Sequence, residues 1–211
     1  MTEAKQTIPH FYVMADADVT RLLALRDELN AAAGDMRLSL TPFVVAAVAR
    51  AMRRLPEINR IWDDGELVTL DGIDIGLAVI TERGLMAPVL RNADRLSLEG
   101  LARALQNLVA RARRGRLTAA DLAGGVISVS NVGMFGAAQL IPIINPGQAA
   151  ILGVAAVRPA FRPDDKGQPS LRQELGLVLS CDHRVLDGVS AARFLGAVTE
   201  SLRQPLTLLR G

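Results

Sequence analysis

The sequence is poor in the residues that most often carry redox and metal chemistry. Among 211 residues there is one cysteine, Cys181, and there are two histidines, His10 and His183. One cysteine cannot form a disulfide within the chain, which is typical of a reducing compartment, so we expect a cytoplasmic protein. These three residues show none of the spacings that zinc sites use, and we therefore expect no metal.

Long apolar segments and an excess of one charge are also missing. No apolar run approaches the roughly 20 residues that span a bilayer, and no signal-peptide pattern opens the chain. Lys and Arg number 24 against 22 Asp and Glu, a net charge of +2, so the pI of 9.2 does not indicate nucleic-acid binding. The arginine cluster at 111–116 is interpreted as the solvated end of a helix. We expect neither membrane nor nucleic-acid partners.

Half of the residues are hydrophobic, yet aromatic residues make up only 3%. The surplus consists of Ala, Leu and Val, which suit close packing of helices against a sheet, and it also suits a subunit interface. The length favours one large domain, and we expect a single domain over residues 1–211.

Hydrophobic periodicity and turn residues predict a mixture of strands and helices without strict alternation. The class is therefore α+β with a large mixed sheet. Strands are predicted at 11–17, 61–70 (a hairpin turning at Asp64-Gly65), 73–81, 85–90, 126–131, 149–157 and 174–182. Helices are predicted from Asp18 to Ala33, from a Thr41 cap to Leu55, from a Ser97 cap to Arg114, at 118–121 as a capping box, and at 189–202. The segment 158–170 is predicted to be an exposed loop because it is rich in Pro, Asp and Gly.

The most informative segment is DHRVLDG at residues 182–188, between a predicted strand and a predicted helix. A strand positions His183 rigidly while leaving it at an edge that a ligand can reach. His183 is a candidate general base, with Asp187 as an electrostatic partner. The alternative is a structural histidine, in a turn that an Asp182–Arg184 pair merely makes rigid.

Three further candidates come from the residues alone. Cys181 and His183 share a strand face, which admits a nucleophile pair, although a thiol in an apolar strand is usually inert. Ser130 and Asn131 end the strand 126–131 beside a glycine-bearing loop, where the Ser130 hydroxyl could stabilise an oxyanion, or the two residues could simply form a turn. His10 has no acidic neighbour in sequence and is interpreted as structural.

Three motifs in order resemble one family. DHRVLDG (182–188) is similar to the active-site signature of the dihydrolipoamide acyltransferases of 2-oxo acid dehydrogenase complexes, which share the chloramphenicol acetyltransferase fold. GGVISVSNVGMFG (124–136) and INPGQAAILG (144–153) resemble two further signatures, and QTIPHFY (6–12) resembles the start of the catalytic domain. The resemblance covers nearly the whole chain and is strongest to the pyruvate type, which suggests acetyl transfer.

The resemblance implies a mechanism and partners. His183 matches the base that deprotonates a thiol, Ser130 matches the hydroxyl that stabilises the oxyanion, and Asp187 matches an acid that holds the turn. The substrates implied are coenzyme A and S-acyl-dihydrolipoamide. The family's trimers place the active site between subunits and assemble into cubic or dodecahedral cores with the other dehydrogenase subunits. A eukaryotic member would lie in the mitochondrial matrix.

The family's lipoyl and subunit-binding domains have no counterpart in the sequence, so the lipoyl group is expected to be supplied in trans. Two other functions stay open. One is a structural core that contributes assembly alone, and the other is an acetyltransferase that acts on a small hydroxylated molecule.

Overall fold

A six-stranded mixed sheet organises the chain, with the strand order β1-β10-β9-β8-β4-β7. The computed structural model describes residues 1–32 and 37–209. Strand β8 pairs in parallel with β4 and β9, while the other neighbours in this sheet are antiparallel. The expected α+β class with a mixed sheet is confirmed.

The strands of this sheet are β1 (His10–Asp18), β4 (Ile75–Leu77), β7 (Val89–Leu90), β8 (Ile127–Asn131), β9 (Ala150–Pro163) and β10 (Pro169–Asp182). Two small antiparallel pairs are β2 (Arg60–Asp63) with β3 (Glu66–Thr69), and β5 (Val79–Thr81) with β6 (Gly84–Met86). The α-helices are α1 (Thr2–Thr7), α2 (Thr20–Ala32), α3 (Leu40–Arg54), α4 (Leu98–Arg113), α5 (Ala119–Leu122) and α6 (Gly188–Arg203). Short 3-10 helices are η1 (Pro56–Ile58), η2 (Ala93–Arg95), η3 (Gly133–Phe135) and η4 (Pro205–Leu209).

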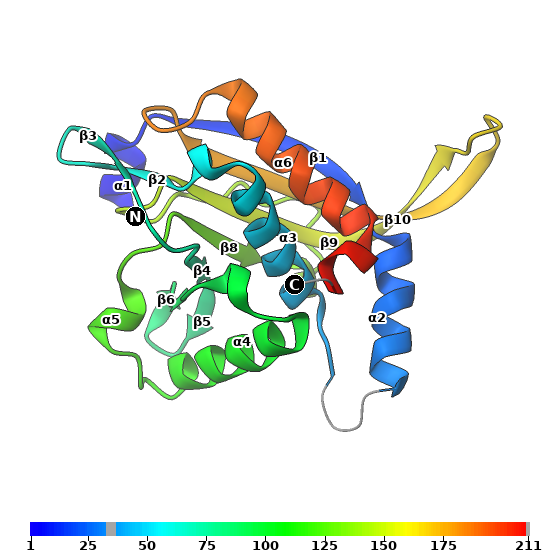
Figure 1. The fold of residues 1–211 in the computed structure, drawn as a ribbon, viewed down its shortest axis with the longest axis horizontal. Coiled ribbons are helices and arrows are strands. Elements are labelled where there is room, and N and C mark those ends of the chain that lie inside the picture. Colours follow the sequence, from blue (N-terminus) through cyan, green and yellow to red (C-terminus); the bar gives the residue numbers. More distant parts are fainter. Residues whose placement is uncertain (33–36, 210–211) are drawn as a thin grey trace.

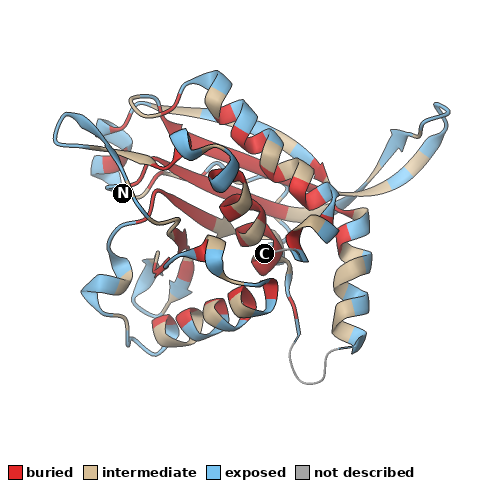
Figure 2. Cartoon of the chain, viewed as in Figure 1, coloured by how far each residue is buried: buried red, intermediate tan, exposed pale blue. Residues whose placement is uncertain are grey.

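Helices α3 and α6 cover one face of the sheet, and the core lies between these layers (Figure 1). The inward positions of β10, Leu175, Leu177, Leu179 and Cys181, alternate with outward ones and join that core, as a period of two requires. Buried residues therefore concentrate along the sheet and the inner sides of the two helices (Figure 2). Among the described residues, none of the helices combines the length and apolar character that crossing a bilayer requires.

Most predicted elements are confirmed because their signals are local. Ser97 accepts a hydrogen bond from the Gly100 N–H at the start of α4, and Thr118 with Asp121 forms the predicted capping box of α5. The hairpin β2–β3 turns at Asp64 and Gly65, whose φ angles are 43° and 90°. Two consecutive residues with positive φ are typical of a type I′ hairpin turn.

The loop predicted at 158–170 is wrong. Strands β9 and β10 continue through this segment in register from Val157–Leu175 to Pro163–Pro169, so that only residues 164–168 form a turn. Prolines are tolerated here because the outer part of the hairpin has lost its neighbouring strands and has free edges. We call residues 158–163 and 169–174 the ribbon; it projects beyond the rest of the sheet (Figure 1).

Two helix boundaries also differ from the prediction or fall outside the description. Ser39, not Thr41, precedes α3, and Pro42 still lies in its first turn. Thr41 instead accepts a hydrogen bond from Asn131 at 3.2 Å, a long-range contact that sequence spacing cannot reveal. Helix α2 is described to Ala32, so its predicted end at Ala33 lies outside the described residues.

Candidate active site

The turn between β10 and α6 is held by a buried ion pair. Asp182 is 1% exposed, and its carboxylate accepts hydrogen bonds from the Arg184 Nε and Nη2 atoms and from the Arg184 backbone N–H. The Asp182 carbonyl accepts from the N–H groups of Val185 and Leu186. A planar guanidinium that binds both carboxylate oxygens fixes geometry as well as charge. The predicted pairing within this turn is therefore confirmed.

His183 stands on this rigid turn and is exposed in the single chain. Its backbone N–H donates to the Pro9 carbonyl at 3.0 Å, and its ring lies 4.6 Å from the Phe11 ring centroid. The Trp62 ring of β2 lies 5.5 Å from the Arg184 guanidinium carbon, so an aromatic ring supports the neighbouring side chain as well. The His183 imidazole is therefore supported by its neighbours and still exposed to solvent, so a ligand can reach it.

Asp187 is the N-cap of α6 and forms a capping box with Ser190. Its carboxylate accepts from the Ser190 N–H at 2.7 Å, while its own N–H donates to the Ser190 hydroxyl at 3.1 Å. Hydrogen bonds from the backbone and side chain of Ser190 lower the pKa of Asp187, and the nearby charge of His183 contributes less. Asp187 thus stabilises the turn through its bonds to Ser190, and no hydrogen bond to His183 makes it a direct proton partner.

Ser130 is the penultimate residue of β8 and is half-buried, and the side chain of the next residue, Asn131, fixes its surroundings. The Asn131 side chain accepts from the Gly133 N–H at 2.9 Å and donates to the Thr41 hydroxyl at 3.2 Å. A Cβ on Gly133 would lie 2.5 Å from the Ala155 carbonyl oxygen, so only glycine lets η3 approach β9 this closely. Among the described residues, the Ser130 hydroxyl has no hydrogen-bonding partner.

Ser128 points to the same face as Ser130 but is fully engaged. Its hydroxyl donates to Gln148 Oε1 at 2.6 Å and accepts from Asn145 Nδ2 at 2.9 Å. Gln148 Nε2 in turn donates to the Gly124 carbonyl at 3.3 Å. This buried network fastens the 144–148 segment to β8, which gives Ser128 a structural role.

Ser130 and His183 lie far apart in one chain. Ser130 pairs with Gly153 of β9, Gly153 pairs with Val178 of β10, and Val178 is five residues from His183. At about 3.3 Å per residue and 4.8 Å between strands, the two residues are separated by about 16 Å along the sheet and about 10 Å across it. Hydrogen-bond reach is about 3 Å, so one copy of the chain cannot bring these side chains together.

A cavity of about 630 Å³ opens beside the Ser130 end of β8. Apolar residues of α4 and of the segment 77–80 form much of its lining, and Asn131, Thr41, Arg37 and Arg113 add polar groups and two positive charges. Met134 and Phe135 of η3 complete it. A space of this size and mixed lining suits an elongated ligand with an anionic part.

The other candidates from the sequence are structural. Cys181 is completely buried, and burial together with the Asp182 charge raises its pKa to about 12, which contradicts a Cys181–His183 nucleophile pair. Both ring nitrogens of His10 contact backbone groups of the chain. Its Nδ1 lies 2.9 Å from the Ile8 carbonyl oxygen, and its Nε2 accepts from the Ile144 N–H at 3.2 Å.

The sequence did not predict the cavity or its polar residues. Four segments separated by tens of residues build it, around positions 37–42, 77–80, 102–113 and 131–135. The only local signal was the Ser130-Asn131 pair at a strand end, which an ordinary turn explains equally well.

The fold is that of chloramphenicol acetyltransferase. A solved structure of that enzyme superposes with a TM-score of 0.61 at 16% identity, covering 95% of this chain and 92% of the other, a likeness of fold alone. The family model for the 2-oxoacid dehydrogenases acyltransferase (catalytic domain) matches residues 1–210. The chain belongs to this family, as its three motifs indicated.

Relatives of known name agree on the family and differ in the acyl group. The chain is 36% identical over 213 residues to the acetyltransferase component of the Rickettsia bellii pyruvate dehydrogenase complex, covering 99% of this chain and 50% of that protein. It is 39% identical over 207 residues to the lipoamide acyltransferase component of the Bacillus subtilis branched-chain alpha-keto acid dehydrogenase complex, covering 96% and 48%. The chain thus spans about half the length of these relatives.

Solved structures support the same family. The cubic core of a pyruvate dehydrogenase multienzyme complex superposes with a TM-score of 0.91 at 33% identity, covering 99% of this chain and 87% of the other. Azotobacter vinelandii dihydrolipoamide acetyltransferase, from an investigation of a serine, a histidine and an asparagine in its catalytic mechanism, superposes with a TM-score of 0.91 at 32% identity, with the same coverage.

Asp187 is expected to make stability depend on pH in the acidic range. Because folding lowers the pKa of this carboxyl, its contribution is fully present above the unfolded-state value of about 3.9 and is lost as pH falls through the lowered native value. Asp187→Asn keeps a capping oxygen but removes the charge. Thermal denaturation followed by circular dichroism should show the variant melting below wild type near neutral pH, with the gap closing in acid. A gap that stays constant down to strongly acidic pH would contradict this account.

Proposed function

We propose that this chain transfers an acyl group between S-acyl-dihydrolipoamide and coenzyme A. The observation that carries the proposal is the pair of available groups, the exposed His183 imidazole on a rigid turn and the Ser130 hydroxyl, which has no hydrogen-bonding partner among residues 1–32 and 37–209. Both belong to motifs shared with the acyltransferase family, to which the chain belongs.

The spacing of the candidate residues supports the assignment. In the Azotobacter vinelandii enzyme the serine and histidine under investigation are 52 positions apart, and the asparagine follows the histidine by four. Here Ser130 and His183 are 53 positions apart, and Asp187 follows His183 by four. Asparagine and aspartate are both good helix N-caps, so a capping role accommodates either residue.

The proposed reaction requires a base and an oxyanion donor. His183 takes the proton of the coenzyme A thiol, whose ordinary pKa of about 8.5 leaves it mostly protonated at neutral pH. The thiolate attacks the thioester carbonyl, and Ser130 donates a hydrogen bond to the oxygen that becomes negative. Collapse of this intermediate breaks the bond to the dihydrolipoamide sulfur, which receives the proton from the imidazolium. The acyl group never joins the protein.

Two copies must build each site, because one chain holds His183 and Ser130 too far apart. We propose a homotrimer in which each copy gives its His183 to one neighbour and its Ser130 to the other. A head-to-tail contact of this kind closes into a ring when the rotation fits. Assembly of trimers into a larger core with dehydrogenase subunits follows the likeness to the cubic core.

The cavity beside Ser130 is proposed as the coenzyme A site. Its apolar lining from α4 suits the pantetheine arm, and Arg37 and Arg113 complement phosphate groups. The lipoyl group then approaches from the other side, carried by a lipoyl domain outside residues 1–211.

We propose acetyl as the acyl group. Met134 and Phe135, bulky residues directly after the Ser130 strand, line the cavity and reduce the space for a branched chain. The motif resemblance to the pyruvate type supports the same choice. One methylene in an apolar pocket is worth only about 1–3 kcal/mol, so the preference is expected to be moderate.

The second prediction tests the shared site. His183→Ala and Ser130→Ala should each lower turnover of acetyl-coenzyme A with dihydrolipoamide by at least about 100-fold, because they remove the base or the oxyanion donor. Co-refolding the two variants should restore activity, since random pairing leaves about a quarter of the sites intact. Two assembled but inactive variants that fail to complement would contradict a site between copies. Wild-type particles without any turnover would favour a purely structural core.

The third prediction concerns the cavity. Val109→Trp places an indole in the proposed pantetheine path and should raise the KM for coenzyme A by roughly tenfold or more, while the KM for dihydrolipoamide changes little. Asn107→Trp, on the exposed side of the same helix, is the control. Equal effects of the two variants on coenzyme A would refute the assignment.

The fourth prediction concerns the choice of acyl group. Wild type should prefer acetyl- over isobutyryl- and succinyl-coenzyme A, and Phe135→Ala should raise the relative kcat/KM for isobutyryl-coenzyme A by about tenfold. Ile141→Ala, which removes an exposed apolar side chain outside the cavity, should leave the ratio unchanged. A wild-type preference for isobutyryl would overturn the acetyl assignment.

A further inference from the structure

The last two residues of β8 are paired on one side only. β4 pairs with β8 from Ile127 to Val129, after which the chain of β4 continues into the separate β5–β6 pair. Within the described ranges, 1–32 and 37–209, Ser130 and Asn131 have strand partners on β9 alone. A strand with one neighbour twists more freely than a strand with two, because one row of its ladder hydrogen bonds is missing. Ser130 therefore stands where the sheet holds the chain from one side.

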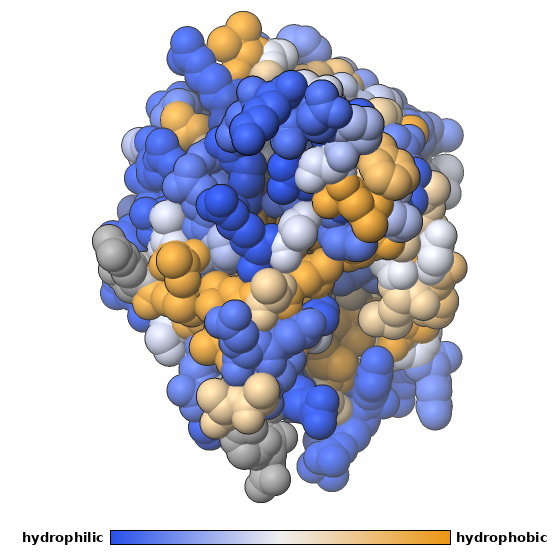
Figure 3. All heavy atoms as spheres, turned by 90° about the vertical axis from the view of Figure 1, so that its right-hand side faces the viewer, coloured by the Kyte–Doolittle hydropathy of each residue, from blue (hydrophilic) through white to orange (hydrophobic). Residues whose placement is uncertain are grey.

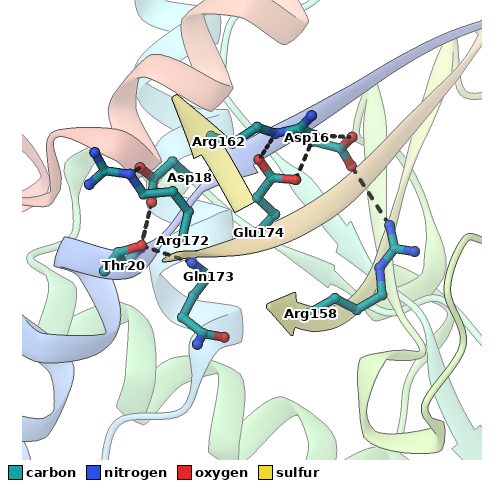
Figure 4. Close-up of polar contacts among 8 residues, drawn as sticks. All are labelled: Asp16, Asp18, Thr20, Arg158, Arg162, Arg172, Gln173 and Glu174. Atoms are coloured by element: carbon teal, nitrogen blue, oxygen red, sulfur yellow. Dashed lines mark hydrogen bonds and ion pairs between the residues drawn. The ribbon is translucent and has the colours of Figure 1, made fainter. Parts of the chain in front are cut away.

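Elsewhere in the sheet, side chains brace a strand that runs past its neighbour. β9 continues beyond the end of β8 into the ribbon, and opposite charges fasten the ribbon there (Figure 4). Arg162 donates through Nε and Nη2 to the two Glu174 carboxylate oxygens at 2.7 and 2.9 Å. Asp16 of β1 lies 4.0 Å from both Arg158 and Arg162. The end of β8 has a brace of another kind.

Asn131 supplies this brace through both ends of its side-chain amide. Its Oδ1 accepts from the Gly133 N–H at 2.9 Å, which fixes the backbone two residues on, and its Nδ2 donates to the Thr41 hydroxyl at 3.2 Å. Thr41 lies in the first turn of α3, where residues 42–45 are buried, and a β-branched side chain has few rotamers. The end of β8 is thereby tied to a rigid point on a helix of the core.

The direction of the Ser130 side chain depends on this tie. Successive side chains of a strand project to opposite faces, so Asn131 points to the α3 face of the sheet and Ser130 to the other face. A rotation of the strand about its own axis would move both side chains together. Holding the Asn131 amide on α3 therefore also fixes the direction in which the Ser130 hydroxyl projects.

Among the described residues, no side chain holds the Ser130 hydroxyl itself. β8 runs parallel to β9 and ends toward the side from which the ribbon projects (Figure 1). Viewed from that side, the surface shows a hydrophobic band between hydrophilic regions (Figure 3). Directly after the strand, η3 adds Met134 and Phe135, which are 77% and 66% exposed and offer a hydroxyl no strong donor or acceptor. The direction of the hydroxyl is therefore set through the backbone.

We propose that Asn131, anchored on Thr41, is a positioning residue that aims the Ser130 hydroxyl at the oxyanion. The inference rests on the proposed function for the role of Ser130. An oxyanion donor is effective because it is aimed before the charge develops, and a displacement of about 1 Å can lower the rate roughly 100-fold. Loss of the Thr41 hydroxyl is expected to slow the chemical step and to leave substrate binding nearly unchanged.

The test measures kcat and the KM values for acetyl-coenzyme A and dihydrolipoamide. Thr41→Val removes the acceptor of the Asn131 amide at almost unchanged volume, and it should lower kcat about tenfold while both KM values change less than about twofold. Thr41→Ser keeps the hydroxyl and should stay within about twofold of the wild-type kcat. Thr199→Val is the matched control, because the Thr199 hydroxyl donates to the Gly196 carbonyl within α6, and it should behave as wild type.

A second measurement combines Thr41→Val with Ser130→Ala. If Thr41 acts through the Ser130 hydroxyl, Thr41→Val should change the residual kcat of Ser130→Ala by less than about twofold, because the group that it aims is already absent. A merely structural role of Thr41 predicts instead the same loss of about tenfold in both backgrounds.

The outcomes separate this inference from the proposed function. An unchanged kcat in Thr41→Val, an equal loss in Thr41→Ser, or additive losses in the double variant would overturn the positioning role alone, provided that Ser130→Ala lowers turnover. If Thr41→Val lacks a cooperative thermal transition, Thr41→Ala replaces it under the same criteria. A wild type without turnover, or one that Ser130→Ala leaves unchanged, refutes the proposed function, and the positioning role is refuted with it because the hydroxyl then serves no reaction.

Discussion

The pairing register of β8, β9 and β10 sets the condition under which this molecule can act. Backbone hydrogen bonds across three strands hold Ser130 and His183 at opposite ends of one sheet, and no rotamer change can bridge that distance. The sheet serves as a rigid spacer with one of the two proposed catalytic groups at each end. In the proposed reaction, two copies must therefore associate before the acyl group can be transferred.

Each half of the site is made rigid by a different device. At the His183 end, a buried carboxylate and a guanidinium close the turn, and a helix cap continues it. At the Ser130 end, the Asn131 side chain fastens η3 and reaches α3, while the Ser128 network fastens the segment behind the strand. Preorganised groups of this kind lose little entropy when a partner and substrates arrive. The surroundings of His183 and Ser130 are thus fixed within each copy before the proposed association.

Sequence patterns predicted the parts of this structure that neighbouring residues decide. Ser97 and Thr118 begin helices because their side chains bond to N–H groups within three residues. Motifs identified the family for the same reason, since each one is contiguous.

The failures are all non-local. The ribbon at 158–163 and 169–174 contains residues that favour turns, and cross-strand pairing overrode that preference. The Asn131–Thr41 contact spans 90 positions, and the cavity collects four distant segments. The proposed catalytic role of His183 also could not be predicted from neighbouring residues, because its proposed partner, Ser130, lies on another copy.

The burial of Cys181 has a consequence for chemical fidelity. An enzyme that moves an acyl group between two thiols must keep any third thiol out of the exchange, because thiolates attack thioesters and disulfides alike. The single cysteine of the chain stands two residues from His183, yet its thiol is inaccessible and its pKa is raised to about 12. The sheet thus separates the one thiol of the chain from the proposed substrates, so that neither an acylated cysteine nor a mixed disulfide forms as a side product.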